Sequence, residues 1–287
     1  YGFYKLSQEE FEEIISAYND YTVQDIYPVA PLQTGFIYNA LKNPEADHYF
    51  TQMSFDLVGD VDLDVYLQAW QRTVDELDIL RTAFDWRHKE FAQIVVKSVE
   101  LPVNKYDISD QLNEDEAFEN IRTMEKKQKI DLSVPCQTRI AVVTKKYGQI
   151  TILLSQHHII MDGWSLPLLF EHVKQNYLEL KDIGDNIHRD ILQYGKYIKE
   201  IVGNNSYAKD IDYWKKEVET YDFSEISHPA HNEISNSFAN YEKAESSIIL
   251  KPELTCQIKD ISKKIGVTTS DILLTAWIKL LSAYNNT

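Results

Sequence analysis

The stretch from Ser155 to Ser165, SQHHIIMDGWS, gathers the residue types that proton-transfer chemistry needs. A histidine can exchange a proton near neutral pH, and a nearby carboxylate can orient the loop that carries it. His157 and His158 are adjacent, Asp162 follows, and Gly163 comes next, where it allows a tight turn or a close backbone approach. The stretch is therefore the first candidate for an active site.

Metal binding and covalent catalysis both fit this stretch poorly. On a strand, His157 and His158 point to opposite faces, and no third His or Cys stands nearby at ligand spacing. The sequence has no G-x-S-x-G nucleophile turn, no GxxxxGK[ST] phosphate loop and no GxGxxG. What remains is one histidine acting on a proton or a developing charge, with the other in the core. A packed, hydrogen-bonded histidine pair before an ordinary Asp-Gly turn is the alternative.

The flanking sequence predicts how the histidines are held. Residues 139–159 form two β-rich runs around a Lys-Lys-Tyr-Gly turn, which predicts a hairpin whose second strand ends at the histidines. Ser165 is expected to cap a helix that has Pro167 in its first turn and runs to residue 180. The candidate site is thus the end of a strand, a loop and a helix N-terminus, where loops commonly carry function.

The rest of the chain mixes helices and strands without a regular alternation, which predicts an α+β fold. A polar connector is expected at 19–25, and an apolar helical stretch follows the two prolines of 26–41. The other expected helices are 7–18, 63–77, 114–127, 191–201, 210–218, 252–265 and 270–284, and the other expected strands are 49–59, 80–86, 91–97 and 243–250.

Composition narrows the functional classes. The 287 residues, 44% of them apolar, can form one large domain or two lobes. The formal net charge of −16, with no Lys/Arg block, argues against a nucleic-acid binder. Cys136 and Cys256 show no pairing pattern, which fits a reduced, cytoplasmic setting. The N-terminus lacks a signal-peptide profile, and no apolar run approaches the roughly 18 residues of a membrane span.

The segment HHIIMDG resembles the HHxxxDG signature of condensation domains in nonribosomal peptide synthetases, within the chloramphenicol acetyltransferase-like superfamily. Three further segments resemble the family's motifs in the same order and spacing: IYPVAPLQTGFIYNAL, LDILRTAF and IDLSVPCQTRI. Three positions depart from the pattern. Glu76 and Leu77 stand where the family usually has a basic residue and a histidine, and Thr34 stands where a charged residue is common. The family's later motifs, including a strand ending in Ser-Gly-Arg, are absent.

The resemblance implies a two-lobed, V-shaped fold with a tunnel between the lobes, and a second lobe that is truncated here. Residues 1–26 would be a linker and helix after an upstream carrier domain. Residues 27–180 would form the first lobe, and residues 181–287 would begin the second. The implied partners are upstream and downstream peptidyl carrier domains and an adenylation domain, with no nucleic acid and no membrane. The domain itself would bind no cofactor or metal, since its substrates hang on the carriers' phosphopantetheine arms.

The implied reaction is peptide-bond formation between a donor acyl or peptidyl thioester and an acceptor aminoacyl thioester. By the resemblance, His158 is catalytic: it would take the amine's proton or stabilise the tetrahedral intermediate. His157 would pack in the core. Asp162 would orient the loop through an arginine, for which Arg81 is one candidate and an arginine outside this chain another. Gly163 would line the tunnel with backbone.

Other functions remain open. An epimerisation domain of the same family uses the same histidine, although it tends to follow the glycine with Val-Ser-Trp rather than Trp164, Ser165 and Leu166. A free acyltransferase using coenzyme A and a non-catalytic module that docks carrier domains are the further alternatives. We expect Trp164 to be a core aromatic, and we expect the truncated chain to be inactive alone.

Overall fold

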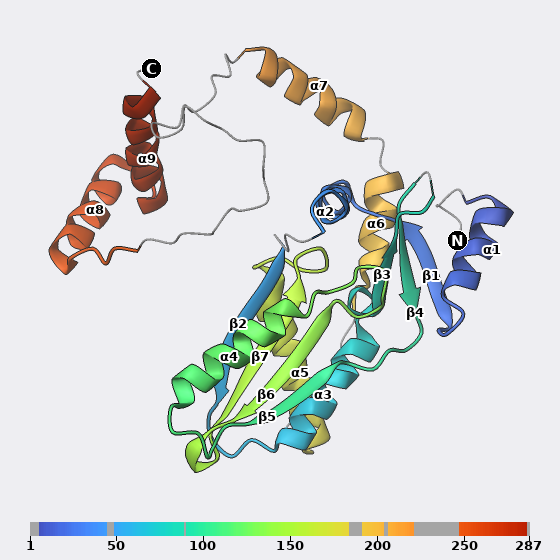
Figure 1. The fold of residues 1–287 in the computed structure, drawn as a ribbon. Coiled ribbons are helices and arrows are strands. Elements are labelled where there is room, and N and C mark those ends of the chain that lie inside the picture. The colour runs from blue at the N-terminus through green and yellow to red at the C-terminus, as the bar shows by residue number, and fades with distance from the viewer. Residues whose placement is uncertain are drawn as a thin grey trace. The chain divides into compact units, whose positions relative to one another are not determined.

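The computed structural model describes residues 6–44, 49–88, 90–183, 191–203, 206–220 and 247–285. By its internal contacts the chain forms two compact units, Tyr1–Asn205 and Ser206–Thr287. Strands and helices combine in the first unit, and the secondary-structure elements described in the second are helices (Figure 1). The α+β fold expected from the sequence is confirmed.

A four-stranded sheet carries the histidines. Its order is β2 (Phe50–Leu57), β7 (Ile150–His157), β6 (Thr138–Thr144) and β5 (Val103–Asp107). The predicted hairpin is confirmed: β6 pairs antiparallel with β7, and Tyr147 takes a positive φ of 57° in the turn between them. The predicted strand at 49–59 is confirmed as β2. Strand β5 was not predicted, and it pairs parallel with β6.

A smaller sheet lies beside the first, in the order β1 (Val23–Pro28), β4 (Ala92–Val96) and β3 (Thr82–Asp85). The predicted strand pair at 80–86 and 91–97 is confirmed. The prediction of a polar connector at 19–25 is wrong in part, because β1 begins at Val23. Pairing with β4 and the burial of Ile26 and Tyr27 make this segment a strand despite its polar residues.

Helices cover both faces of the larger sheet (Figure 1). Helices α3 (Leu63–Glu76) and α5 (Ser165–Leu180) pack against each other and share a core with the inward side chains of β6 and β7. Helix α4 (Glu114–Lys127) lies on the opposite face, where Ile121 packs with Ala141 and Leu153. Alternate residues of each strand therefore enter different cores, and the histidine pair lies at the end of a strand covered on both sides.

Helix α1 (Gln8–Ala17) confirms the helix expected at 7–18, and it begins with a capping box of Ser7 and Glu10. Its buried Ile14 joins Ile26 and Ile94 in a core of its own against the smaller sheet. The helix is therefore packed into the first unit.

Helix α6 (Tyr194–Gly203) also belongs to the first unit. Its Ile198 is fully buried with Tyr27 and Val95, and the Asp78 carboxylate accepts hydrogen bonds from the first backbone N–H groups of the helix. Burial and capping of α6 therefore place it in the first compact unit, which ends at Asn205. The lobe boundary after residue 180 stays a prediction.

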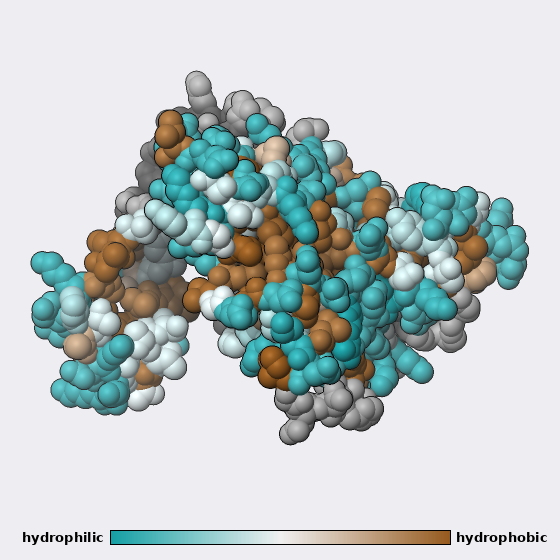
Figure 2. All heavy atoms as spheres, turned by 90° about the horizontal axis from the view of Figure 1, so that it is seen from below, coloured by the Kyte–Doolittle hydropathy of each residue, from teal (hydrophilic) through white to brown (hydrophobic). Residues whose placement is uncertain are grey.

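The second unit contains α7 (Ser206–Glu219), α8 (Pro252–Ile265) and α9 (Thr269–Asn285). The helix expected at 252–265 is confirmed as α8: Pro252 is its first residue, and Gly266 follows its last residue at φ +72°. The strand expected at 243–250 is wrong for residues 247–250, which are irregular and exposed; residues 243–246 lie outside the described ranges. Apolar residues of α8 and α9 reach the surface (Figure 2). Within the described ranges, no single helix is long and apolar enough to cross a membrane. Only as a pair, with a sharp bend between them, do α8 and α9 have the length and composition of a membrane span.

Candidate active site

The histidine pair lies where β7 ends. His157 is the last residue of the strand, and its backbone N–H donates to the carbonyl of Gln137 at 3.1 Å. The backbone N–H of His158 donates to the carbonyl of Tyr49 at 2.8 Å, just before β2. Strands on both sides of β7 thus hold the backbone of the pair. The predicted position at a strand end, before a loop and a helix, is confirmed.

His157 is a buried, neutral residue. Only 4% of it is exposed, and its Nδ1 accepts a hydrogen bond from the backbone N–H of Ile159 at 3.1 Å. Burial, together with a smaller repulsion from His158, lowers the pKa of His157 to about 4. At neutral pH the ring therefore carries its proton on Nε2. This geometry suits a packing role.

His158 is partly exposed, and its ring lies beside a phenylalanine. The centroids of the His158 and Phe36 rings are 6.0 Å apart, at an interplanar angle of 27°. Among the residues that the structure describes, the His158 imidazole has no hydrogen-bond partner. None of the described residues therefore occupies its nitrogens.

Asp162 organises the loop through Ser165. Its Oδ1 accepts hydrogen bonds from the Ser165 backbone N–H at 2.9 Å and from the Ser165 hydroxyl at 2.7 Å. These bonds lower the pKa of the Asp162 carboxyl, with a smaller contribution from the charge of His158. The expectation that Ser165 caps the helix needs correction: Ser165 is the first helical residue, and Asp162 satisfies its N–H.

Arg81 serves another part of the fold. Its buried guanidinium donates to the carbonyl of Val74 at 3.0 Å, to Gln24 Oε1 at 2.9 Å and to the carbonyl of Lys97 at 3.2 Å. The suggested pairing of Arg81 with Asp162 is therefore wrong. Main-chain carbonyls of α3 and of the segment after β4, together with the Gln24 side chain, use the donors that such a pair would need.

The two residues after Asp162 face open space. Gly163 has no positive φ, and a Cβ at this position would meet no atom within 4 Å. The expectation that Trp164 is a core aromatic is wrong, because the side chain is 89% exposed. Trp164 precedes the first turn of α5, whose buried face begins only at Leu169.

Sequence reasoning missed three neighbours of the histidines. Helix α2 (Pro31–Lys42) contributes Gln33 and Phe36, and Tyr49 precedes β2. Gln33 is buried, and its Nε2 donates to the carbonyl of Ile159 at 3.1 Å. Gln33 and Phe36 lie within the motif-like run IYPVAPLQTGFIYNAL, so the run marked the segment without revealing the contacts.

A cavity of about 320 Å³ lies beside the loop. It lies among residues 77–80, the loop, the first turns of α5 and the start of α6. Its lining includes Ile160, Met161, Leu168, His172 and Tyr194. Within the described ranges, no group of three or more His, Cys, Asp or Glu residues could hold a metal ion.

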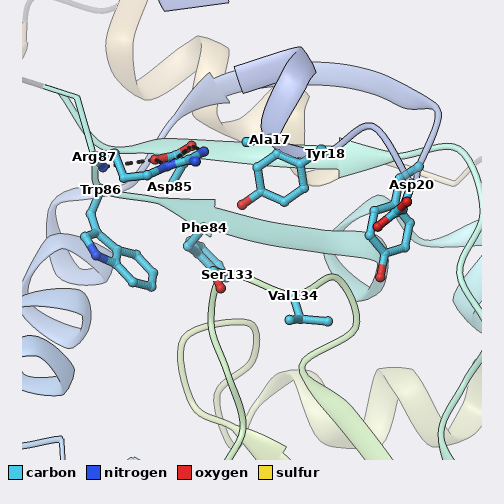
Figure 3. Close-up of a pocket in the computed structure, with 10 residues that line it drawn as sticks. Ala17, Tyr18, Asp20, Phe84, Asp85, Trp86, Arg87, Ser133 and Val134 are labelled. Atoms are coloured by element: carbon cyan, nitrogen blue, oxygen red, sulfur yellow. Dashed lines mark hydrogen bonds and ion pairs between the residues drawn. The ribbon is translucent and has the colours of Figure 1, made fainter. Parts of the chain in front are cut away.

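A second cavity of about 450 Å³ lies between the end of α1, β3 and residues 133–134 (Figure 3). The buried Asp85 carboxylate there pairs with Arg87, which lies toward it in the figure. The ring of Tyr18 also lines this cavity, and burial raises the pKa of its hydroxyl. No residue of the histidine loop contributes to the lining, so the cavity is separate from the candidate site.

Comparison with known proteins gives the family. Residues 23–287 match the family model for the condensation domain. The chain is 26% identical to tyrocidine synthase 2 of Brevibacillus parabrevis over 94% of its own length and 8% of that protein. It is 27% identical to gramicidin S synthase 2 of Brevibacillus brevis over 95% of its length and 6% of that protein. The chain thus spans only a small part of the length of these relatives.

Solved structures show the same fold. The starter condensation domain of rhizomide synthetase RzmA matches with a TM-score of 0.61 at 19% identity, over 68% of this chain and 50% of that one. The condensation domain of the monacolin K polyketide synthase MokA matches with a TM-score of 0.69 at 16% identity, over 93% of this chain and 61% of that one. Together with the family model, which covers nearly the whole chain, these matches show that the chain belongs to the condensation-domain family, as its resemblance to nonribosomal peptide synthetases indicated.

Proposed function

We propose that this domain forms a peptide bond between two substrates held as thioesters on the phosphopantetheine arms of carrier domains. The acceptor amine attacks the carbonyl carbon of the donor thioester. The new C–N bond forms, the C–S bond breaks, and the proton lost by the amine ends on the released donor thiol. The partners are the upstream and downstream carrier domains, with an adenylation domain supplying the aminoacyl group.

The observation that carries the proposal is the different surroundings of two adjacent histidines. His157 is buried and its Nδ1 is used within the turn, whereas His158 is partly exposed and its imidazole has no partner among the described residues. His158 is therefore the residue that can take the amine's proton or stabilise the tetrahedral intermediate. Asp162 holds the loop, and the open space at Gly163 leaves room for a substrate beside it.

The test uses the intact synthetase with loaded donor and acceptor carriers, and it measures the dipeptidyl carrier by mass spectrometry. His158→Ala is expected to lower the rate by about 10²–10⁴ with an unchanged melting temperature. His158→Gln keeps a hydrogen-bonding group but cannot act as a base. Substantial activity in this variant would favour stabilisation of the intermediate over proton transfer. A near-wild-type rate for His158→Ala would exclude a catalytic role.

Epimerisation is the second candidate, because the same histidine could remove an α-proton. The order Trp164, Ser165 and Leu166 after the glycine favours condensation. Incubation of a loaded aminoacyl carrier with the enzyme in D₂O separates the two reactions. We expect no deuterium at the α-carbon, and incorporation that depends on His158 would establish epimerisation instead.

A further inference from the structure

Helix α2 meets the histidine turn at two points. Gln33 Nε2 donates to the carbonyl of Ile159 at 3.1 Å, directly after the histidine pair. One helical turn later, the ring of Phe36 lies along the ring of His158. The same helix therefore holds the backbone of the turn and places an aromatic ring beside the imidazole.

Phe36 is itself held in place by aromatic neighbours. Its ring centroid is 4.5 Å from that of Tyr49, at an angle of 60°, and 6.3 Å from that of His157, at 82°. These are edge-to-face geometries within the range of favourable aromatic pairs. The carbonyl of Tyr49 also accepts a hydrogen bond from the backbone N–H of His158. Its hydroxyl accepts a second one from the Asn39 side chain of α2, at 3.4 Å. The aromatic group thus connects the helix, the strand end and the histidine pair.

We propose that Phe36 is a positioning residue for His158, a role that rests on the catalytic function proposed above. The imidazole has no hydrogen-bond partner among the described residues, so hydrogen bonds to these residues do not fix its rotamer. The offset, nearly parallel ring of Phe36 restricts rotation of the His158 side chain. Correct placement of such a group contributes directly to the rate of the chemical step.

The test compares four variants of the intact synthetase. Phe36→Leu removes the ring but keeps an apolar side chain, whereas Phe36→Tyr keeps the ring. Tyr38→Leu is the matched control, because Tyr38 is an exposed aromatic of the same helix. Phe36→Met serves as a second non-aromatic variant in case Phe36→Leu folds poorly.

Phe36→Leu is expected to lower kcat about tenfold while KM for the loaded carriers stays within about twofold. Phe36→Tyr is expected to recover a kcat near that of wild type, and Tyr38→Leu to leave it unchanged. A merely structural role would lower the amount of folded enzyme without this division between kcat and KM.

A second measurement does not depend on turnover. Diethyl pyrocarbonate modifies exposed, neutral imidazoles, and peptide mass spectrometry gives the rate at His158. The rate is expected to rise in Phe36→Leu and to stay at the wild-type value in Phe36→Tyr and Tyr38→Leu. Equal kcat and equal modification in Phe36→Leu and Tyr38→Leu would overturn the positioning role. If His158→Ala is inactive while Phe36→Leu is normal, this inference alone fails; if His158→Ala is active, the proposed function fails.

Discussion

The backbone N–H of Ile159 donates to Nδ1 of His157 at 3.1 Å, so the first histidine uses its acceptor nitrogen within its own turn. This bond defines the neutral tautomer of His157. The turn is also free of backbone strain, because no residue between His157 and Ser165 has a positive φ. The two adjacent histidines are therefore chemically different before any substrate arrives. One is a buried structural group, and the other presents its ring to the outside.

The depressed pKa of His157 makes the fold sensitive to acid. The unfolded chain takes up a proton near pH 6.5, whereas the folded chain resists protonation down to about pH 4. As pH falls through this window the unfolded state binds more protons, so stability is lost. The loss attributable to His157 is about 3 kcal/mol. In His157→Asn, the side-chain oxygen can still accept from Ile159 but does not titrate.

Urea unfolding at pH 7 and pH 4.5 checks this prediction. Wild type is expected to lose more unfolding free energy between the two pH values than His157→Asn, although the variant starts lower because packing is lost. Parallel pH dependences in the two proteins would show that His157 does not titrate differently in the folded and unfolded states.

Asp162 is expected to act through Ser165 as a hydrogen-bond acceptor. Asp162→Ala removes both bonds to Ser165 and should lower the rate of product formation about tenfold or more, because the loop beside His158 loses its position. Asp162→Asn keeps an acceptor oxygen and should stay closer to wild type. Steady-state rates with loaded carriers provide the measurement. Equal damage in both variants would indicate that the negative charge is what matters.

Trp164, next to the site, and Trp70, in the core, should respond differently to replacement by alanine. Trp164 is 89% exposed, so Trp164→Ala should change the unfolding free energy by less than about 0.5 kcal/mol. Trp70 is fully buried in α3, so Trp70→Ala should cost about 3–5 kcal/mol. Urea unfolding measures both values. A large loss for Trp164→Ala would show that its side chain is covered in solution.

The 287-residue chain expressed by itself is expected to form no product. It covers only 50% of the solved RzmA starter condensation domain and 61% of the solved MokA condensation domain. Helix α9 has apolar side chains that are about half exposed, among them Leu273, Leu274, Trp277 and Ile278. Exposed apolar surface of this kind favours association. Dipeptidyl-carrier formation and light scattering test the expectation. Turnover comparable to that of the intact synthetase by a monomeric chain would contradict it.

The local placement of the candidate site was predictable from the sequence. The β-rich runs around Tyr147 specify a hairpin, and Pro167 marks the first turn of the following helix. Both signals act over a few residues, through backbone conformation and side-chain alternation. They were sufficient to place His157 and His158 at the end of a strand, and the HHxxxDG resemblance identified the family.

Contacts between distant segments were decided only by the tertiary structure. The polar start of β1 is a strand because β4 pairs with it, and Arg81 bonds to carbonyls that the fold brings to it. Phe36 meets His158 across more than a hundred residues of sequence, and Trp164 is exposed because the buried face of α5 begins later. Local periodicity determines which side chains share a face of one element. It cannot specify which other element packs against that face, because that choice depends on packing and hydrogen bonding in the whole folded unit.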